Sequence, residues 1–254
     1  MILTVVPLSE RPELQKGFND PLLNSAWPAF MLEDPIANLY FGPGRFERYQ
    51  EYVIVAFDPD APDEVLGRGC SVPFYLGEDV GRAELPDGGW DTVVRWADQD
   101  FAAGRSPNAV SALEITLHPR LVGQGFSGRM VEALKANAGR LGFNDLYAPV
   151  RPSQKHLEPA TPMQDYMERT RPDGLPFDPW LRVHVRLGGE IVKVAPYSMT
   201  IPGTLGAWRA WTGLPFEHDG LTEVPGALVP VFVSLAQQYA VYVEPNVWVR
   251  HRLS

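Results

Sequence analysis

Short runs of β-branched and apolar residues alternate with helical patterns along most of the chain. Strands are predicted at residues 2–7, 52–57, 65–75, 109–117, 146–150, 190–195, 228–235 and 239–243. Apolar positions at helical spacing predict helices at residues 90–102, 125–141 and 179–187. Between residues 13 and 41, Pro21, Pro28 and Pro35 divide the pattern into two or three short helices. The order of elements predicts an α/β fold.

The organisation predicted is one compact unit with an appendage. Residues 1–204 form the main α/β domain, in which residues 77–108 are a long Gly-, Pro- and Asp-rich insertion that contains a helix. Residues 205–254 form a β-rich C-terminal extension packed on the same domain. Three roles are open for this extension: it completes the sheet, covers one side of a binding site, or pairs two copies into a homodimer.

The most informative segment joins the strand at 109–117 to the helix at 125–141. The strand runs into His118-Pro119, and Gly123-Gln124-Gly125-Phe126-Ser127-Gly128 then opens the helix. Glycines allow backbone N–H groups to approach a ligand, and a helix start adds unpaired donors and partial positive charge. The segment therefore suits a pyrophosphate.

Three other interpretations of this glycine turn compete. The first is a dinucleotide-binding turn, because the segment matches a bare G-x-G-x-x-G. Such a turn comes early in a βαβ unit, whereas this one follows more than a hundred residues of other elements. A P-loop is excluded because no Gly-Lys-Ser/Thr follows. A glycine-rich helix entrance without any ligand is the third.

The order of elements from residue 2 to 195 resembles the Gcn5-related N-acetyltransferase superfamily. The family motif is a strand, a Val/Leu-x-Pro and an Arg/Gln-x-x-Gly-x-Gly/Ala that opens the helix, and Leu117-His118-Pro119 followed by residues 122–127 matches it in register. Val122 stands where the family has Arg or Gln, and Ser127 stands at the last Gly/Ala position. An alternative alignment of the motif, which begins at Arg120, matches the residue types better but breaks the spacing from Pro119.

The resemblance implies a mixed, mostly antiparallel sheet flanked by helices and a V-shaped gap that binds acetyl-CoA or another acyl-CoA as co-substrate. A short acyl group would pass directly to an amine of a small molecule, amino acid or peptide. The implied acyl-CoA contacts are Ile115, Leu117, Val122, Gly123, Gln124, Gly125, Phe126, Ser127, Gly128, Ser153 and Lys155. The 77–108 insertion is expected to border the acceptor side of the gap.

The catalytic candidates follow from the same resemblance. His184 occupies the place of the family's acidic tyrosine, four residues before Gly188, and an imidazolium with a pKa near ~6.5 can protonate a leaving thiolate. Glu114 is the candidate base, although it faces the other side of the strand unless the strand bulges. Tyr166 is a further candidate. Two alternatives to an acyltransferase stay open: a non-catalytic CoA-binding module on this fold, and a dinucleotide-binding oxidoreductase.

Composition narrows the partners. The formal net charge is −9 and the isoelectric point is about 5.1, without a long basic run, so neither nucleic acid nor anionic membrane is expected as a partner. The single cysteine, Cys70, excludes an internal disulfide, and the histidines lack ligand-like spacing, so no metal is expected. The apolar start of the chain lacks a basic region, which argues against a signal peptide and predicts a cytoplasmic protein.

Overall fold

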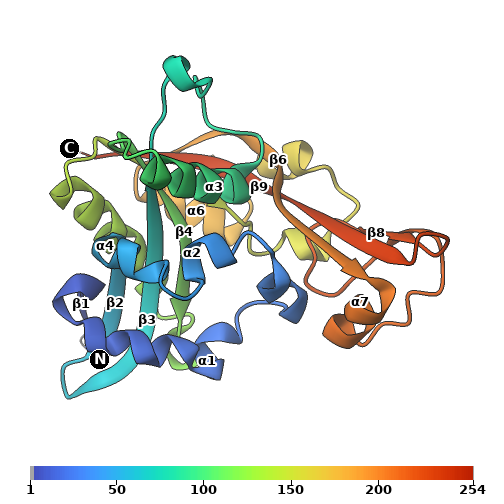
Figure 1. The fold of residues 1–254 in the computed structure, drawn as a ribbon, viewed down its shortest axis with the longest axis horizontal. Coiled ribbons are helices and arrows are strands. Elements are labelled where there is room, and N and C mark those ends of the chain that lie inside the picture. Colours follow the sequence, from blue (N-terminus) through green and yellow to red (C-terminus); the bar gives the residue numbers. More distant parts are fainter. Residues whose placement is uncertain (1–2, 254) are drawn as a thin grey trace.

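The computed structural model describes residues 3–253, whose strands form one nine-stranded sheet (Figure 1). Its order is β1-β2-β3-β4-β5-β9-β8-β7, and β6 also pairs with β9. The strands are β1 Thr4–Pro7, β2 Val53–Asp58, β3 Ala61–Phe74, β4 Ala109–Leu117, β5 Asp145–Val150, β6 Gly189–Thr204, β7 Gly220–Thr222, β8 Val231–Ser234 and β9 Tyr239–Arg252. The β4–β5 pair is parallel and the other pairs are antiparallel. This architecture confirms the predicted fold class.

Helices cover both faces of the sheet. The α-helices are α1 Pro21–Asn24, α2 Asn38–Phe41, α3 Gly89–Ala102, α4 Phe126–Arg140, α5 Met163–Met167, α6 Pro179–Arg186 and α7 Leu205–Thr212. Short 3₁₀ helices lie at Leu8–Glu10, Pro12–Asn19, Ala29–Glu33, Phe46–Tyr52, Glu78–Val80, Pro119–Leu121 and Lys155–Leu157. Side chains of β2 alternate between two cores: Val53 and Val55 pack in the core that contains α3, and Ile54 packs in the core under α4. Helices α3 and α4 therefore lie on opposite faces.

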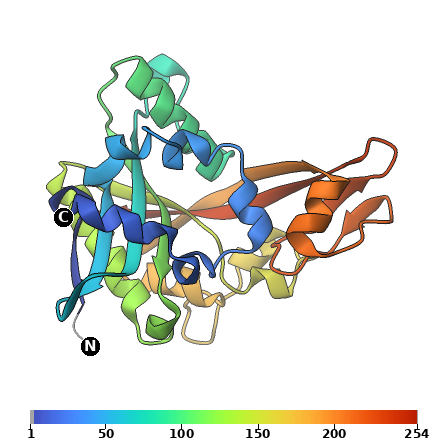
Figure 2. The same ribbon diagram turned by 60° about the horizontal axis from the view of Figure 1, so that its bottom comes forward.

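The long strand β9 settles what the C-terminal extension does in the sheet. It pairs with β5 through Asp145↔Arg252 to Val150↔Val247, and with β6 through Gly189↔His251 to Thr204↔Tyr239. Figures 1 and 2 show that the ends of β6 and β9, with α7 and β8, project from the body as an arm. The extension thus completes the sheet, and the boundary at residue 204 stays a prediction.

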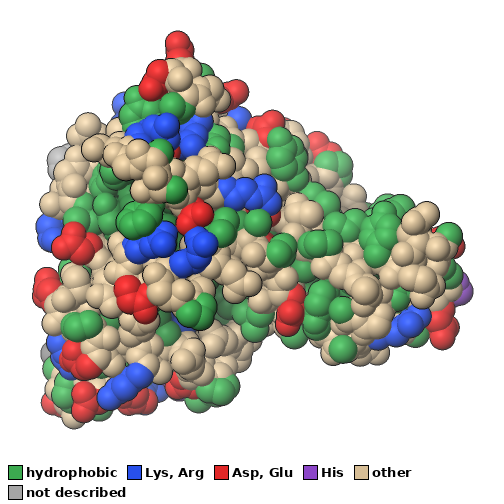
Figure 3. Space-filling model, in the orientation of Figure 1, with side chains coloured by type: hydrophobic (Ala, Val, Ile, Leu, Met, Phe, Trp, Pro, Cys, Tyr) green, Lys and Arg blue, Asp and Glu red, His purple; other side chains and the backbone are tan. Residues whose placement is uncertain are grey.

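The arm is tied to the N-terminal part of the chain by aromatic packing. Phe30 packs against Trp208 and Tyr242, with ring centroids 5.5 and 5.3 Å apart. The short helices at the N-terminal end therefore bridge the body and the base of the arm. Farther out, Leu221 and Phe232 remain exposed on the arm, where Figure 3 shows hydrophobic side chains at the surface.

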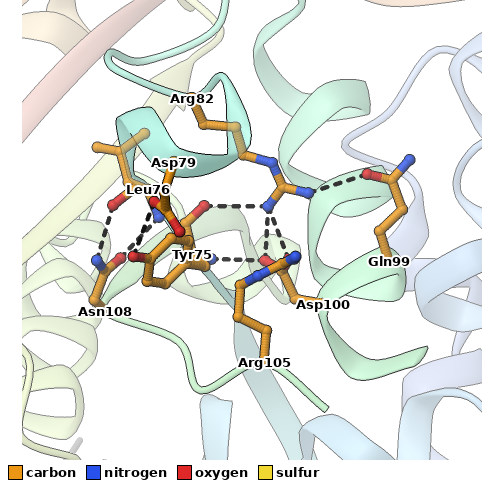
Figure 4. Close-up of polar contacts among 8 residues, drawn as sticks. All are labelled: Tyr75, Leu76, Asp79, Arg82, Gln99, Asp100, Arg105 and Asn108. Atoms are coloured by element: carbon orange, nitrogen blue, oxygen red, sulfur yellow. Dashed lines mark hydrogen bonds and ion pairs between the residues drawn. The ribbon is translucent and has the colours of Figure 1, made fainter. Parts of the chain in front are cut away.

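The 77–108 insertion is anchored by a buried polar network (Figure 4). The carboxylate of Asp100 accepts hydrogen bonds from Arg82 at 2.8 and 2.9 Å and from the Tyr75 N–H at 2.7 Å, and it also pairs with Arg105. The apolar face of α3, which includes Val93, packs in the main core. The insertion is therefore an integral layer of the domain.

Two buried carboxyl groups, Asp34 and Asp91, are neighbours at the junction of the N-terminal helices and the insertion. Each residue is 3% exposed. Oδ1 of Asp34 accepts from the Ile36 N–H, and Oδ2 of Asp91 accepts from the Thr200 N–H. The other two oxygens, Oδ2 of Asp34 and Oδ1 of Asp91, have no hydrogen-bond partner among residues 3–253. Burial and the neighbouring Asp34 raise the pKa of Asp91 to about 9, although Arg95 opposes the shift.

Because of this pair, the free energy of unfolding is expected to fall as pH rises. The folded protein holds a proton that the unfolded chain releases, so the stabilisation is complete below pH 3.8 and is lost as pH rises towards about 9. The slope is on the order of 1 kcal/mol per pH unit. Asp91→Asn has nearly the same shape but does not titrate, so its Tm should fall less than that of the wild type between about pH 6 and 9. Parallel Tm curves for the two proteins would contradict the raised pKa of Asp91.

Candidate active site

A V-shaped gap opens where β4 and β5 separate. The two strands pair only at Val110↔Leu146 and Ser111↔Tyr147, and the rest of β4 has no β5 partner among the described strands. The pairing of β3 with β4 slips between Cys70↔Glu114 and Ser71↔Ala112, which leaves Leu113 as the extra residue of a bulge. This bulge is the condition under which Glu114 could face the gap.

The gap continues into a cleft of about 670 Å³, large enough for a small acceptor and the acyl end of a thioester. The N-terminal helices, α3, β4, β5, α6 and β9 contribute to its walls. Its polar lining includes Asn24, Arg68, Glu114, Arg151, Ser153, His184, Glu244 and Asn246, and its aromatic lining includes Phe18, Trp27, Phe41, Phe46, Trp90 and Trp180. Trp90 comes from the insertion, and its Nε1 donates to the carbonyl of Leu113 at 3.1 Å. The insertion therefore forms part of the cleft wall.

The glycine turn follows β4 and leaves several of its backbone N–H groups open. Gly123 and Gly125 have φ angles of +79° and +78°, which glycine adopts without strain. A Cβ at either position would meet no described atom within 4 Å. Their N–H groups make no backbone hydrogen bond within residues 3–253 outside the helices, and α4 begins at Phe126, whose side chain is buried.

Two of the predicted amide donors in this turn are already engaged. The Val122 N–H donates to the Pro119 carbonyl at 3.2 Å, and the Gln124 N–H donates to the Leu121 carbonyl at 3.3 Å. The open donors are those of Gly123, Gly125 and the first turn of α4, which includes Ser127 and Gly128. The turn therefore leaves fewer open amides than the sequence analysis expects for binding a pyrophosphate. Ile115 lines the cleft, and Leu117 leads from β4 into the turn.

Glu114 is held in the cleft by a buried ion pair. Its Oε1 accepts from Nε of Arg68 at 2.6 Å and from the Cys70 thiol at 3.4 Å. The other Arg68 nitrogens donate to the Phe18 carbonyl and to Asn24, which fixes the guanidinium. Oε2 of Glu114 accepts no hydrogen bond from the described part of the chain. The side chain is thus oriented through one oxygen and leaves the other available.

His184 also lines the cleft but is 4% exposed. Its Nδ1 lies 2.9 Å from Nε2 of His251, and its ring packs edge-on against Trp180. Burial, and then His251, lowers the pKa of His184 to about 3. Burial thus disfavours the imidazolium form that the sequence analysis expects of His184, because a charged ring is costly away from water. The Nε2 atom has no protein partner among residues 3–253.

The structure turns Tyr166 and Lys155 away from the cleft. Tyr166 is 1% exposed and its hydroxyl donates to Asp178, the N-cap residue of α6, at 3.0 Å. Lys155 is fully buried, and its ammonium donates to the carbonyls of Glu158 and Leu228. The Lys155 ammonium is therefore engaged by carbonyl groups of the protein, and Lys155 is outside the cleft lining. Ser153, by contrast, is exposed and lines the cleft.

Sequence reasoning missed a second ion pair, Arg151–Glu244, in the cleft wall. Arg151 directly follows β5 and Glu244 lies on β9, so the two are 93 positions apart. A basic residue at the end of the strand that borders the gap was the available signal. Within residues 3–253, no group of three His, Cys, Asp or Glu side chains is placed to hold a metal, and no helix is long and apolar enough to cross a membrane.

Comparison with known proteins identifies the family. Over 267 residues the chain is 33% identical to the arginine N-acetyltransferase avaD of Aspergillus versicolor, which covers 95% of this chain and 91% of that protein. The fold is similar to that of the loading GNATL domain of CurA from Lyngbya majuscula, with a TM-score of 0.57 and 14% identity over 100% of this chain and 98% of that one. No family model matches the sequence.

The similarity to avaD confirms the activity predicted from the glycine turn and the order of elements. The protein is an enzyme that transfers an acyl group from acyl-CoA to an amine. The fold and the sequence similarity agree along nearly the whole chain. The chain therefore belongs to the Gcn5-related N-acetyltransferase superfamily.

Proposed function

We propose that the enzyme transfers an acetyl or other short acyl group from acyl-CoA to a nitrogen of arginine or of a small arginine-containing molecule. The observation that carries this proposal is the open Oε2 of Glu114 in a cleft lined by aromatic side chains. A guanidinium group pairs with carboxylates and stacks on aromatic faces. The name of the relative avaD, an arginine N-acetyltransferase, supports the same acceptor.

The groups around the gap fit the acyl-CoA. The open amides at Gly123 and Gly125, with the start of α4, would hold the pyrophosphate. The edge of β4 that lacks a β5 partner, which includes Ile115, offers backbone groups to the pantetheine arm. Both contacts would direct the thioester into the cleft, towards Glu114 and His184.

These residues support direct transfer. Oε2 of Glu114 accepts a proton from the acceptor nitrogen, directly or through a water, while the nitrogen attacks the thioester carbonyl. An N–C bond forms and the C–S bond breaks, and the proton removed by Glu114 returns to the departing thiolate. If His251 donates to Nδ1 of His184, the neutral His184 presents its Nε2–H to the sulfur. The role proposed for His184 is thus a hydrogen bond to the leaving group.

The acceptor assignment can be tested by thiol release from acetyl-CoA over a panel of amines. Arginine and an arginine-containing dipeptide should exceed lysine and tyramine in kcat/KM by about tenfold or more, because the latter lack the guanidinium fork. Mass spectrometry of the products would show which nitrogen is acylated. Turnover of lysine or tyramine at the rate of arginine would contradict the assignment.

The role of His184 predicts a moderate loss without a change in pH dependence. His184→Phe removes the donor and keeps a flat ring, so turnover should fall by about 10- to 100-fold. Because the pKa of His184 is about 3, the wild-type kcat profile should show no inflection from this group near neutral pH. His156→Phe is the control, since His156 is outside the cleft lining. Undiminished turnover of a folded His184→Phe protein would exclude the role.

A further inference from the structure

Arg151 has one guanidinium nitrogen that the protein does not use. Its Nε donates to both oxygens of Glu244, at 3.1 and 2.9 Å, and its Nη2 donates to the Gly226 carbonyl. Nη1 makes no hydrogen bond to any of residues 3–253. The side chain is 18% exposed and lines the cleft. One edge of this guanidinium is therefore fixed by the protein, and Nη1 is left for a ligand.

Glu244 is built to hold Arg151. It is completely buried and accepts two further hydrogen bonds, from the Tyr242 hydroxyl at 2.8 Å and from Nδ2 of Asn246 at 3.0 Å. Burial acts to lower the pKa of Arg151, but Glu244 outweighs it and the pKa is raised, so the guanidinium stays charged. With both oxygens engaged, Glu244 has little capacity left for a cationic ligand. The pair presents a positioned cation to the cleft.

The other cation of the cleft does not offer the same opportunity. All three nitrogens of Arg68 donate to protein groups, namely Glu114, Asn24 and the Phe18 carbonyl. The two ion pairs are thus complementary in what they leave free: an acceptor oxygen on Glu114 and a donor nitrogen on Arg151. A ligand that satisfies both would carry a cationic or amine group and, elsewhere, an anionic group.

We propose that Arg151 binds a carboxylate carried into the cleft by one of the two co-substrates. Guanidinium is the side chain best matched to a carboxylate, and a charge-assisted hydrogen bond in a partly buried site is strong. The carboxylate belongs either to the acceptor, as in a free amino acid, or to the acyl group of a dicarboxylic acyl-CoA. This inference rests on the proposed function for the two co-substrates, and it adds the residue that distinguishes acid-bearing substrates from their neutral or decarboxylated analogues.

Equilibrium binding tests the proposal without relying on turnover. Kd is measured by calorimetry for L-arginine against agmatine in the presence of CoA, and for succinyl-CoA against acetyl-CoA. In one of these pairs the wild type should bind the carboxylate-bearing compound more tightly than its analogue. Arg151→Lys should raise the Kd for that compound by about tenfold or more, and should change the Kd for the analogue by about twofold or less. The pair that responds identifies the source of the carboxylate.

Two further variants separate recognition from folding. Arg250→Lys is the matched control, because Arg250 of β9 makes a two-point ion pair with Asp145 of β5 but is outside the cleft lining. Arg151→Met combined with Glu244→Gln removes both buried charges at once, so it avoids an unpaired carboxylate if the lysine variant is unstable. It should lose the same preference.

Three results would overturn the proposal: no carboxylate preference in either pair for the wild type, a preference that survives in Arg151→Lys and the double variant, or an equal loss for all four compounds. The last would assign Arg151 to the architecture of the cleft. The proposed function fails by a different result, the absence of acyl transfer to arginine-bearing acceptors.

Discussion

Glu114→Gln should lower kcat/KM for the acceptor by about 10²- to 10⁴-fold while the protein remains folded. The amide oxygen can still accept from Arg68, whose other nitrogens keep their contacts with Phe18 and Asn24. The amide NH₂ that replaces Oε2 cannot accept a proton from the acceptor nitrogen. Steady-state kinetics with acetyl-CoA and the best acceptor, beside a Tm measurement, would show the loss.

A matched substitution separates this loss from a general electrostatic effect. Glu64 forms an ion pair with Arg120 outside the cleft, so Glu64→Gln removes a paired carboxylate of the same kind without touching the lining residues. It should leave kcat/KM within about twofold. Glu114→Asp keeps the carboxylate and should recover part of the activity. Full activity of Glu114→Gln would mean that Glu114 only positions Arg68.

The second large effect is expected on acyl-CoA affinity. Gly125→Asp should raise the Kd for acyl-CoA on the order of 10- to 100-fold, because its carboxylate would lie where the pyrophosphate binds. The fold should tolerate the change: a Cβ at Gly125 meets no described atom within 4 Å, and Asp is among the residues that adopt a positive φ. A negative charge at the start of α4 also interacts favourably with the helix dipole.

Gly125→Asn is the control for charge, since it has nearly the same shape as Asp. Its affinity for acyl-CoA should fall much less than that of Gly125→Asp. Gly104→Asp, at another positive-φ glycine with open space around it, should bind as the wild type does. If the aspartate at position 125 leaves the Kd unchanged in a folded protein, the pyrophosphate binds elsewhere.

Most elements of the sheet could be predicted because their periodicity is local. The strand at 109–117 and the helix that follows it agree with β4 and α4 to within a residue or two. The length of β9 could not be predicted, because Pro245 lies in the middle of it and proline normally excludes a central strand. At that point the pairing of β6 with β9 shifts register, between Ala195 and Met199, which accommodates the missing N–H.

In the candidate site, too, local features could be predicted and features that depend on distant residues could not. The glycine turn is a local motif, and the sequence located it. The orientation of Glu114 depends on a bulge at Leu113, and no residue type in this strand predicts that bulge. The pKa of His184 depends on burial and on His251, which comes from β9. The burial of Lys155 and Tyr166 could not be predicted, because Lys155 donates to Leu228, a residue distant in sequence, and Tyr166 is buried within α5 by tertiary packing.

The position of β9 has a consequence for how the chain acquires its structure. Strand β9, which pairs with β5, β6 and β8, is the last of the nine strands in sequence. The sheet therefore cannot be completed until residues 239–252 have been synthesised. Until then, β5, β6 and β8 each have an unpaired edge, and exposed edges promote association between chains. Pairings as distant as Val150↔Val247 also slow folding. A chain interrupted near residue 238 should therefore aggregate rather than accumulate as a partly active fragment.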